Sequence, residues 1–486
     1  MNIAPLEFLA WLKEEHGDDI GVCEHTDDLG EKDIFIASDK ASAYIPLALD
    51  KGAIAVVCAS GVVDSGRPGK IFEVDDVRQF SFSLVQAVYG NDIAQVDLVG
   101  ITGTNGKTST AHFACQLFGL LGESAGYIGT LGYGVVSDGL VASRNTTPDV
   151  VTLYRYISLL YRRGCRHVVM EVSSHALALK RIEGLEFSVG MFTNLSRDHL
   201  DFHGSMEAYE ETKLSFFQDY RIAHWIVNAD YPAGEKLIER KMARDDDTFT
   251  SYGIHEANNG QHFTCRFMED AAHGSGMVEI KTASKSQLIK AGVSGQFNLE
   301  NMVAAVLACH VSGYPLADVV KAAASVKAVP GRMECLLDQK GVKVCIDYAH
   351  TPAGIDAVMS DRMLHAGERG KVWCIFGCGG DRDRGKRPIM GRSVAGHSQR
   401  VIVTDDNVRG DQAEEIICDV LAGIEDKTHV IVCRDRGKAI GCVLDSAIRN
   451  DLVLLLGKGN ESTISYGNHR LFHRDMDAVM KHVSRQ

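Results

Sequence analysis

The sequence predicts an α/β protein whose parallel sheets are covered by helices on both faces. Short, almost continuous apolar runs alternate with helical segments of about 10–15 residues along most of the chain. Strands that are buried on both faces have this composition, and strands that are separated by helices pair in parallel. The chain has 486 residues, which is too many for one ordinary core, so about two to four domains are expected.

Three blocks divide the chain, and each is expected to be a domain. Residues 1–92 are expected to form a small N-terminal α/β domain. Residues 93–329 contain the glycine-rich motif GTNGKT at 103–108 after a predicted strand, so they are expected to form a central P-loop-type ATPase domain with a mostly parallel sheet. Residues 330–486 are expected to form a C-terminal Rossmann-like domain, and Pro330-Gly331 marks the joint before it.

The predicted elements follow these blocks. The first block is expected to have strands at 33–37 and 54–58 with a helix over 43–51 between them. Residues 231–290 are more polar and irregular, so a subdomain or an insertion is expected there. The strands expected in the second and third blocks are 96–101, 167–171, 189–193, 225–228, 342–347, 372–376, 400–404, 430–433 and 452–456.

Composition limits the kinds of partner. The net charge of −13 argues against a nucleic-acid-binding protein that relies on a broad basic surface. The first residues lack a basic segment, so no signal peptide is expected, and the apolar runs are too short to span a bilayer. The 13 cysteines are scattered without a Cys-x-x-Cys pair, which favours reduced thiols. We expect a cytoplasmic monomer that acts on small molecules, without nucleic acid and without membrane insertion.

A glycine-rich segment predicts a phosphate site. The sequence ITGTNGKTST at 101–110 follows the apolar run 96–100 and leads into an amphipathic stretch, which is the order strand, loop, helix. Backbone N–H groups and the helix N-terminus favour phosphate, Lys107 adds a positive charge, and Thr108 offers a hydroxyl to magnesium. The spacing departs from the usual pattern, since the first glycine is Gly103. A plain strand-to-helix turn is the alternative, but such a turn has no need of Lys-Thr.

Further polar clusters follow later strands. Glu171 ends the apolar run 167–170, and a carboxylate at a strand end near a triphosphate is a natural magnesium ligand. The segment 194–204 follows another strand and is dense in ionisable groups, which favours a functional site over a capped turn. His199 and His203 would share a helical face, so a zinc site is a weaker alternative.

Four motifs carry a resemblance to a known family. They are TGTNGKT at 102–108, EVSSH at 171–175, NLSRDHLD at 194–201 and DYAHTP at 347–352. In this order they resemble the signatures of the Mur ligases, and the match runs from about residue 96 to residue 461. The resemblance implies an ATP-dependent amide ligase of peptidoglycan synthesis that adds meso-diaminopimelate to UDP-N-acetylmuramoyl-L-alanyl-D-glutamate through an acyl phosphate.

The resemblance also implies the roles of single residues. Two magnesium ions are implied, with Thr108, Glu171, His199 and Lys213 as ligands, and the family carbamylates this lysine to N6-carboxylysine. From its own surroundings in the sequence Lys213 would be a solvated helix lysine. The residues implied in catalysis are Lys107, Glu171, His199, Lys213, Arg332 and His350. The residues implied in ATP binding are Gly103, Thr104, Asn105, Gly106, Lys107, Thr108, Ser109, Asn298, Asn301, Arg332 and Asp347.

Two other groups of residues are implied to bind substrates. Arg409 in the family's motif favours diaminopimelate over lysine as the added amino acid, whereas plain surface salt bridges are the alternative for the arginines. The residues implied to bind the UDP-muramoyl substrate are Asn145, Thr146, Thr147, Ser173 and Arg181. The residues implied to bind the amino acid are Arg382, Asp406, Asn407, Arg409, Gly457 and Glu461.

The first block departs from the family's pattern. Residues 24–33 lack the family's Asp-Ser-Arg, and the loop at 37–44 is contracted. This departure leaves open a paralogue that joins an amino acid to a carboxylate substrate without UDP. A catalytically inactive nucleotide-binding module is another alternative. A dinucleotide oxidoreductase is weaker, because the glycines at 377–380 have the wrong spacing.

Overall fold

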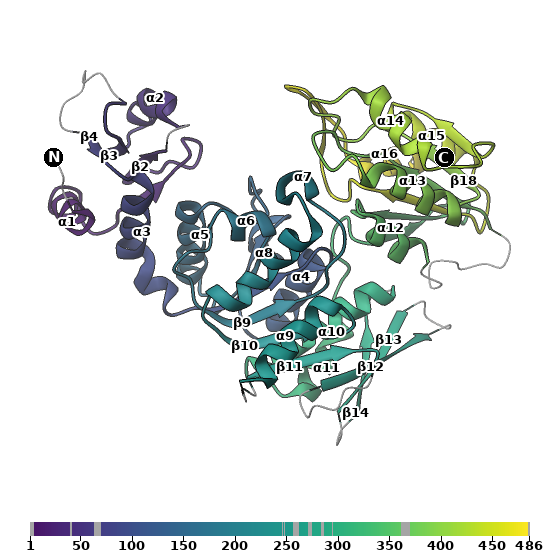
Figure 1. Ribbon diagram of the computed structural model, residues 1–486, viewed down its shortest axis with the longest axis horizontal. Coiled ribbons are helices and arrows are strands. Elements are labelled where there is room, and N and C mark those ends of the chain that lie inside the picture. The colour runs from purple at the N-terminus through teal and green to yellow at the C-terminus, as the bar shows by residue number, and fades with distance from the viewer. Residues whose placement is uncertain are drawn as a thin grey trace. The chain divides into compact units, whose positions relative to one another are not determined.

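A computed structural model describes residues 4–38, 41–62, 70–244, 246, 248–255, 262–270, 275–282, 286–293, 295–360 and 370–484. The chain forms two compact units (Figure 1). The first unit is Met1–Gly100 with Gly122–Ser188, and the second is Ile101–Leu121 with Val189–Gln486. The expected α/β class with mostly parallel sheets is confirmed. The boundaries at residues 92 and 329 remain a prediction.

The first unit begins with a parallel four-stranded sheet in the order β1-β2-β3-β4. Buried side chains of its strands, such as Phe35 and Val56, form one apolar core. The helix expected over 43–51 is shorter, because a 3-10 turn precedes it, and Asp39 and Lys40 lie outside the described residues. The elements are α1 (Pro5–His16), β1 (Gly21–Cys23), β2 (Asp33–Ala37), α2 (Ile45–Asp50), β3 (Ala55–Ala59), β4 (Ile71–Val74) and α3 (Val77–Ile93).

The first unit continues with strands in the order β5-β8-β6-β7. β6 pairs in parallel with β8 and antiparallel with β7, and α5 packs against α3. The side chain of Asp149 caps α5 by accepting a hydrogen bond from the backbone N–H of Thr152. The elements are β5 (Asp97–Thr102), β6 (Ala125–Gly129), β7 (Gly132–Val135), α5 (Val150–Arg162), β8 (His167–Glu171) and α6 (Ser174–Ala178).

The second unit contains the strand run β9-β10-β11-β12-β13-β14. β10, β11 and β12 are parallel, whereas β12, β13 and β14 form an antiparallel meander. The described part of 231–290 is therefore regular structure, a helix and four strands. Its elements are α9 (Pro232–Met242), β11 (Phe249–Gly253), β12 (His262–Asp270), β13 (Ser275–Lys281) and β14 (Ser286–Ala291). The others are α4 (Lys107–Leu120), β9 (Phe187–Phe192), α7 (Leu200–His203), α8 (Met206–Asp219), β10 (Ile222–Asn228), α10 (Gln296–Val311) and α11 (Leu316–Ala323).

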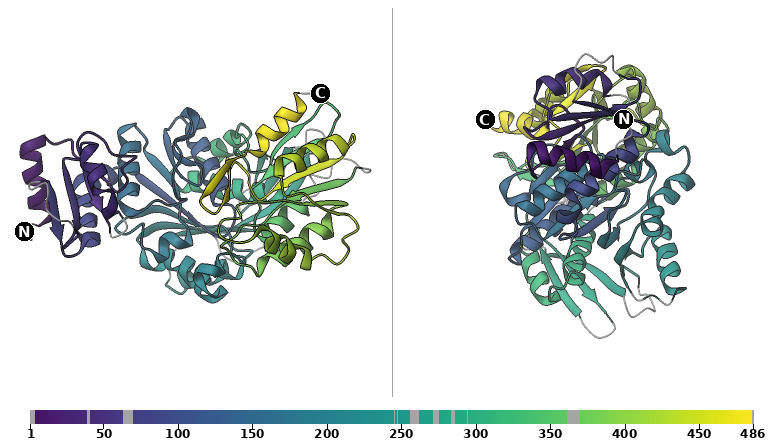
Figure 2. Two further views of the ribbon diagram at one scale, coloured as in Figure 1. Left: turned by 90° about the horizontal axis from the view of Figure 1, so that it is seen from above. Right: turned by 90° about the vertical axis from the view of Figure 1, so that its left-hand side faces the viewer.

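The second unit also holds a six-stranded sheet in the order β15-β16-β20-β17-β18-β19 (green to yellow in Figures 1 and 2). All neighbours are parallel except β15 and β16. An apolar core lies on each face, as the uninterrupted apolar strands predict. Its strands are β15 (Glu334–Leu337), β16 (Lys343–Asp347), β17 (Val372–Phe376), β18 (Arg400–Val403), β19 (Val430–Val432) and β20 (Leu452–Leu456). The remaining elements are α12 (Pro352–Met359), α13 (Lys386–His397), α14 (Ala413–Ala422), α15 (Arg436–Ser446), β21 (Thr463–Tyr466), β22 (His469–Phe472) and α16 (Asp475–Val483).

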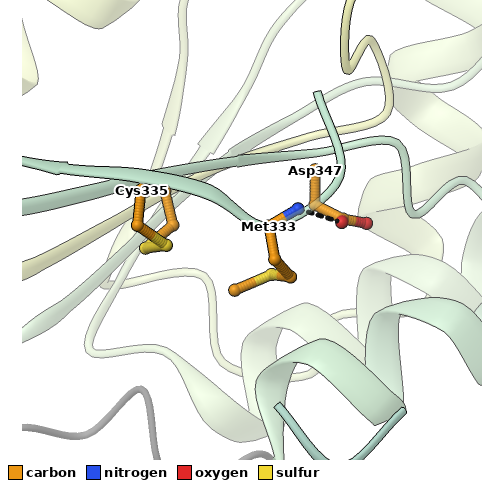
Figure 3. The surroundings of a disulfide bond; sticks show 4 residues. Met333, Cys335 and Asp347 are labelled. Atoms are coloured by element: carbon orange, nitrogen blue, oxygen red, sulfur yellow. Dashed lines mark hydrogen bonds between the residues drawn. A yellow bond between two sulfur atoms is a disulfide. The ribbon is translucent and has the colours of Figure 1, made fainter. Parts of the chain in front are cut away.

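A disulfide corrects one sequence-based expectation. Cys335 on β15 and Cys345 on β16 stand opposite each other in the antiparallel ladder and are bonded (Figure 3). Reduced thiols are expected throughout the chain, and for this pair the expectation is wrong; the other cysteines are not in disulfides. A sequence shows spacing but not register, so it gave no sign that these two side chains meet. Among the described residues no helix has the length and apolarity needed to cross a membrane.

Candidate functional site

The glycine-rich segment forms the predicted loop between β5 and α4. Gly106 precedes α4 with φ 87°, a left-handed conformation that favours glycine. A Cβ at Gly106 would lie 2.3 Å from the Asn301 side-chain oxygen, and one at Gly103 would lie 2.0 Å from Oγ1 of Thr193. The backbone N–H of Asn105 donates to Oδ1 of Asn194 at 2.9 Å. The loop is therefore packed too closely for side chains at either glycine.

Lys107 and Arg332 converge on this loop. The ammonium of Lys107 donates to the carbonyl oxygens of Gly103 at 2.8 Å and Thr104 at 2.9 Å. Nη2 of Arg332 donates to Oγ1 of Thr108 at 3.1 Å, and the guanidinium lies 4.3 Å from the centre of the Tyr348 ring. These contacts bring two cations to one strand-to-helix loop, which is the arrangement that an anionic phosphate chain needs.

Lys213 is buried instead of solvated. Its side chain is 1% exposed, and Nζ donates to the carbonyl oxygen of Gly103 at 2.8 Å. The same nitrogen lies 4.6 Å from the centre of the Tyr209 ring. Burial, together with the charge of Lys107, lowers the pKa of Lys213 well below its ordinary value. The site therefore favours the neutral amine of this lysine.

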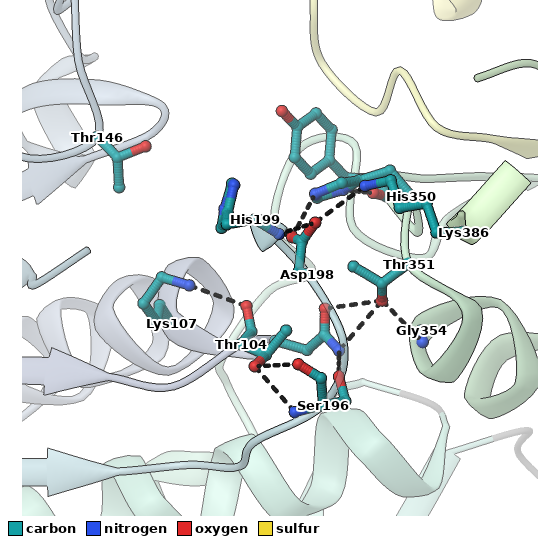
Figure 4. A network of polar contacts seen from close by, with 12 residues as sticks. Thr104, Lys107, Thr146, Ser196, Asp198, His199, His350, Thr351, Gly354 and Lys386 are labelled. Atoms are coloured by element: carbon teal, nitrogen blue, oxygen red, sulfur yellow. Dashed lines mark hydrogen bonds and ion pairs between the residues drawn. The ribbon is translucent and has the colours of Figure 1, made fainter. Parts of the chain in front are cut away.

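Asp198 joins three cationic or ionisable side chains (Figure 4). Its carboxylate lies 2.9 Å from Nζ of Lys386, 3.4 Å from Nε2 of His199 and 3.6 Å from Nε2 of His350. Burial would raise the pKa of Asp198, but the hydrogen bond to His350 and the charge of Lys386 hold that pKa well below its ordinary value. The carboxylate thus stays ionised and fixes the two histidines that the sequence singled out.

Sequence reasoning assigned no role to Asp198 or Lys386. Asp198 stands inside the segment 194–204, whose density of ionisable groups was the only signal. Lys386 begins α13, which is 188 residues away from Asp198 along the chain, and nothing in its own surroundings marks it. The fold brings this lysine to the site.

A cavity of about 470 Å³ lies beside the phosphate loop. Six predicted ATP-binding residues line it, namely Asn105, Gly106, Ser109, Asn301, Arg332 and Asp347. Asn298 is buried on α10 but does not line the cavity. The carboxylate of Asp347 accepts hydrogen bonds from the backbone N–H groups of Met333 at 2.8 Å and Ala349 at 2.7 Å. Burial raises the pKa of Asp347. Lining residues that the sequence did not single out include Tyr231, Phe267, Met268, Gln296, Phe297 and Glu300.

The residues predicted to bind the amino acid also meet. Nδ2 of Asn407 donates to Oε2 of Glu461 at 2.8 Å, and Lys458, which sequence reasoning missed, lies 2.7 Å from Glu461 and 3.6 Å from Asp406. Nη1 of Arg409 donates to the carbonyl oxygen of Gly380 at 2.8 Å. Burial, and next the charge of Arg382, lower the pKa of Arg409. A Cβ at Gly457 would lie 2.9 Å from Asp406, so Gly457 completes the group.

In the first unit the predicted UDP-muramoyl residues form one cluster. The hydroxyl of Thr147 donates to the carbonyl oxygen of Glu171 at 2.7 Å, and it lies 3.2 Å from Oγ of Ser173. Arg181 donates to the carbonyl oxygen of Thr147 at 3.0 Å. The Thr146 hydroxyl lies 3.1 Å from that of Thr130. Asn145 is adjacent in the chain, and its carbonyl oxygen accepts a hydrogen bond from Ser143.

Glu171 is held firmly in the first unit. Its side chain is buried, and Oε1 accepts hydrogen bonds from Tyr127 at 2.7 Å and from the backbone N–H of Thr130 at 2.8 Å. The Thr130 hydroxyl donates to Oε2 at 3.2 Å. Among the described residues no cluster of three or more His, Cys, Asp or Glu side chains could hold a metal ion. The zinc alternative at His199 and His203 therefore gains no support from the described residues.

Comparisons with known proteins agree with this geometry. Residues 101–309 match the Mur ligase middle domain, and residues 331–459 match the Mur ligase, glutamate ligase domain. The UDP-N-acetylmuramoyl-L-alanyl-D-glutamate--2,6-diaminopimelate ligase of Coxiella burnetii is 33% identical over 90% of this chain and 89% of its own length. The ligase of the same name from Pseudomonas putida is 39% identical over 81% of this chain and 79% of its own length.

A solved structure supports the same assignment. The structure of a UDP-N-acetylmuramoyl-L-alanyl-D-glutamate--2,6-diaminopimelate ligase matches with a TM-score of 0.61 and 27% identity, and the match covers 98% of this chain and 99% of that one. The phosphate loop with its two cations, the two matched domains and the extended similarity to these ligases lead to one conclusion. The chain belongs to the Mur ligase family.

Proposed function

We propose that this protein is the ATP-dependent ligase that adds meso-diaminopimelate to UDP-N-acetylmuramoyl-L-alanyl-D-glutamate in peptidoglycan synthesis. The observation that carries the proposal is the convergence of Lys107, Arg332 and Lys213 on one phosphate loop. The substrates in this proposal are those that the names of its relatives state. The protein acts as a monomer in the cytoplasm, and its three domains are 1–92, 93–329 and 330–486.

The reaction proceeds in two displacements. The terminal carboxylate of the UDP-muramoyl dipeptide attacks the γ-phosphorus of ATP, so that an acyl phosphate forms and ADP leaves. The neutral amine of diaminopimelate then attacks the acyl carbon, inorganic phosphate leaves with the electrons of the broken C–O bond, and the new amide nitrogen releases one proton to solvent. Lys107 and Arg332 contact the phosphate loop at Thr104 and Thr108, where their charges would hold phosphate oxygens and stabilise the negative charge that develops in transfer. Asp198 holds His350 beside the transferring group.

Lys213 is proposed to act as a carbamate. Its buried, neutral amine can attack carbon dioxide and lose one proton, which leaves an anionic N6-carboxylysine. Oxygen ligands suit Mg²⁺. In the second unit Thr108 and the carbamate would supply them beside His199, and in the first unit Glu171 is proposed to supply a carboxylate. When bound, Mg²⁺ neutralises phosphate charge during transfer. A bare ammonium at Lys213 would repel such an ion.

The amino acid is proposed to bind at the cluster around Asp406. Arg409 and Arg382 both lie against Gly379 and can pair with carboxylates of diaminopimelate. Asp406, Asn407 and Glu461 offer oxygens to an ammonium group. A second arginine would have no partner in lysine, which has a single carboxylate, so this pair favours diaminopimelate.

A second candidate differs in the carboxylate substrate. Arg144 directly precedes the cluster of Asn145, Thr146 and Thr147, and it pairs with Asp28 at 2.7 Å and with Asp27 at 3.1 Å. The guanidinium of Arg144, beside the proposed muramoyl site, is therefore already paired with two carboxylates. These carboxylates would repel a diphosphate. This observation favours, as the alternative, a ligase whose substrate lacks UDP.

A reconstituted reaction separates the two candidates. Purified protein is incubated with ATP, Mg²⁺, diaminopimelate and the UDP-muramoyl dipeptide, and released phosphate is measured together with the mass of the product. We expect release only when all are present, and none from the Lys107→Ala variant. Release with carboxylate substrates that lack UDP, but none with the UDP-muramoyl dipeptide, would contradict the first candidate and support the second.

A further inference from the structure

The residues that line the cavity beside the phosphate loop are of two chemical kinds. Asn105, Gly106 and Ser109 belong to the phosphate loop and the start of α4. Tyr231, Phe267, Met268 and Phe297 also line the cavity, and these apolar and aromatic side chains suit a planar heterocycle. Gln296 and Glu300 from α10 are the polar side chains that line it among them. A carboxylate would repel triphosphate oxygens, so Glu300 belongs with the base of a nucleotide and not with its phosphates.

The position of Glu300 is fixed by its helix. Nε2 of Gln296 donates to Oε1 of Glu300 at 3.3 Å, an i,i+4 contact in the first turns of α10. The next residue, Asn301, lies 3.3 Å from the Thr110 hydroxyl and packs against Gly106. One helix thus sets the distance between the phosphate loop and the carboxylate. Within the described residues Oε1 takes the bond from Gln296, and Oε2 accepts none.

The surroundings of Glu300 favour a further hydrogen-bond donor to its carboxylate. Burial raises the pKa of Glu300 to about 7, and the hydrogen bond from Gln296 only partly opposes this, while the charge of Asp230 adds to it. A ligand N–H that donates to Oε2 would stabilise the carboxylate, which among the described residues accepts one side-chain hydrogen bond, from the amide of Gln296. No step in the proposed chemistry uses this side chain.

We propose that Glu300 selects adenine, because Oε2 accepts a hydrogen bond from the 6-amino group of the base while Gln296 holds Oε1. The inference rests on the proposed function, since it takes ATP as the bound nucleotide. Adenine carries a donor at position 6, whereas guanine and hypoxanthine carry an acceptor there. Above the pKa of Glu300 the carboxylate is ionised, so two acceptors would face each other and the half-buried carboxylate would have no partner. A site built for a donor rejects a base without one.

Nucleotide binding to the full chain tests this assignment. Dissociation constants are measured by calorimetry at about pH 8.5, where Glu300 is ionised, for ADP, for purine riboside 5′-diphosphate, which lacks the 6-amino group, and for inosine 5′-diphosphate. The three nucleotides have the same ribose and diphosphate, so the ratio of their dissociation constants reports the contribution of the base. We expect wild-type protein to bind ADP at least about 10-fold more tightly than either analogue, as a hydrogen bond to a charged group allows. Equal affinities in the wild type would overturn the inference.

Variants separate recognition from folding. Glu300→Leu keeps the side-chain volume and removes the acceptor, so the ratio should fall towards one even if overall nucleotide affinity changes. Glu300→Gln keeps a carbonyl oxygen and should retain part of the preference, and Glu239→Leu on an exposed part of α9 should leave it unchanged. A Glu300→Leu protein with the wild-type ratio would overturn the inference alone. Absence of binding by any of these nucleotides would overturn the ATP-dependent function as well.

Discussion

The side-chain nitrogen of Lys213 lies 2.8 Å from the carbonyl oxygen of Gly103, so a buried lysine of α8 is joined to the first glycine of the phosphate loop. This contact places the lysine beside the phosphates that the loop is built to hold. It also removes the lysine from water, which favours its neutral form. A neutral, positioned amine is the form that can take up carbon dioxide.

Replacing Lys213 should abolish most of the activity without unfolding the protein. For Lys213→Ala we expect kcat to fall by about 10²-fold or more, because a group that fixes transferring charge is lost. Short carboxylates such as acetate or propionate should restore part of the rate by supplying the missing oxygens. Steady-state phosphate release checks this, with Lys321→Ala on the exposed face of α11 as the control. Full activity of Lys213→Ala without added carboxylate would remove Lys213 from the site.

Arg332 should act mainly in phosphoryl transfer. Lysine keeps the charge but lacks the planar fork that reaches Thr108 and stacks on Tyr348. We expect Arg332→Lys to lower kcat by about 10- to 100-fold with a smaller change in the KM for ATP. Arg392→Lys, on an exposed position of α13, is the matched control. A change confined to KM would show that Arg332 contributes to binding alone.

The Asp198–Lys386 pair should contribute strongly to stability. Both side chains are buried, so Asp198→Asn leaves the ammonium of Lys386 without its counter-charge. We expect a loss of about 3–5 kcal/mol in the free energy of unfolding. The double variant Asp198→Asn with Lys386→Met should recover part of that loss, since both charges are then gone. Denaturant unfolding measures the four proteins of this cycle, and Asp219→Asn is the exposed control. Simple addition of the two single effects would contradict direct coupling.

His112 should make the protein less stable in mild acid. It is buried on α4, and burial lowers its pKa to about 4. An unfolded chain has a histidine pKa of about 6.5, so between these values the unfolded state binds a proton that the folded state does not. Stability is therefore lost as the pH falls from about 6.5 to about 4, by about 2 kcal/mol between pH 7.5 and 5. Thermal unfolding at several pH values should show a smaller acid loss for His112→Asn than for wild type or for the exposed variant His397→Asn. An unchanged pH dependence would contradict this.

The sequence predicted the parts of the fold that depend on local pattern. Apolar runs such as 372–376 and 452–456 became buried central strands, because a strand covered on both faces needs an unbroken apolar composition. The phosphate loop could also be predicted, since its glycines and Lys107 act within a few residues of each other. The strands of the polar segment 231–290 could not be predicted, because strands such as β14 bury only one face, so that buried residues alternate with exposed ones.

Contacts across long sequence separations could not be predicted in the same way. Lys386 reaches Asp198, Lys458 reaches Asp406, and Cys335 meets Cys345 only through tertiary structure and strand register. Lys213 was a typical helix lysine by its neighbours in the chain, and the resemblance to the family was the only reason to single it out. Glu300 lacked any signal, because its proposed function depends on a cavity lined by residues from many separate segments of the chain.

The most direct test of the account follows an oxygen atom. The terminal carboxylate of the UDP-muramoyl dipeptide is labelled with ¹⁸O, the reaction is run with ATP and diaminopimelate, and the released phosphate is analysed by mass spectrometry. An acyl phosphate requires that one carboxylate oxygen leaves with phosphorus, so we predict inorganic phosphate that carries one ¹⁸O atom. Phosphate without the label, released while the amide product forms, would contradict the account.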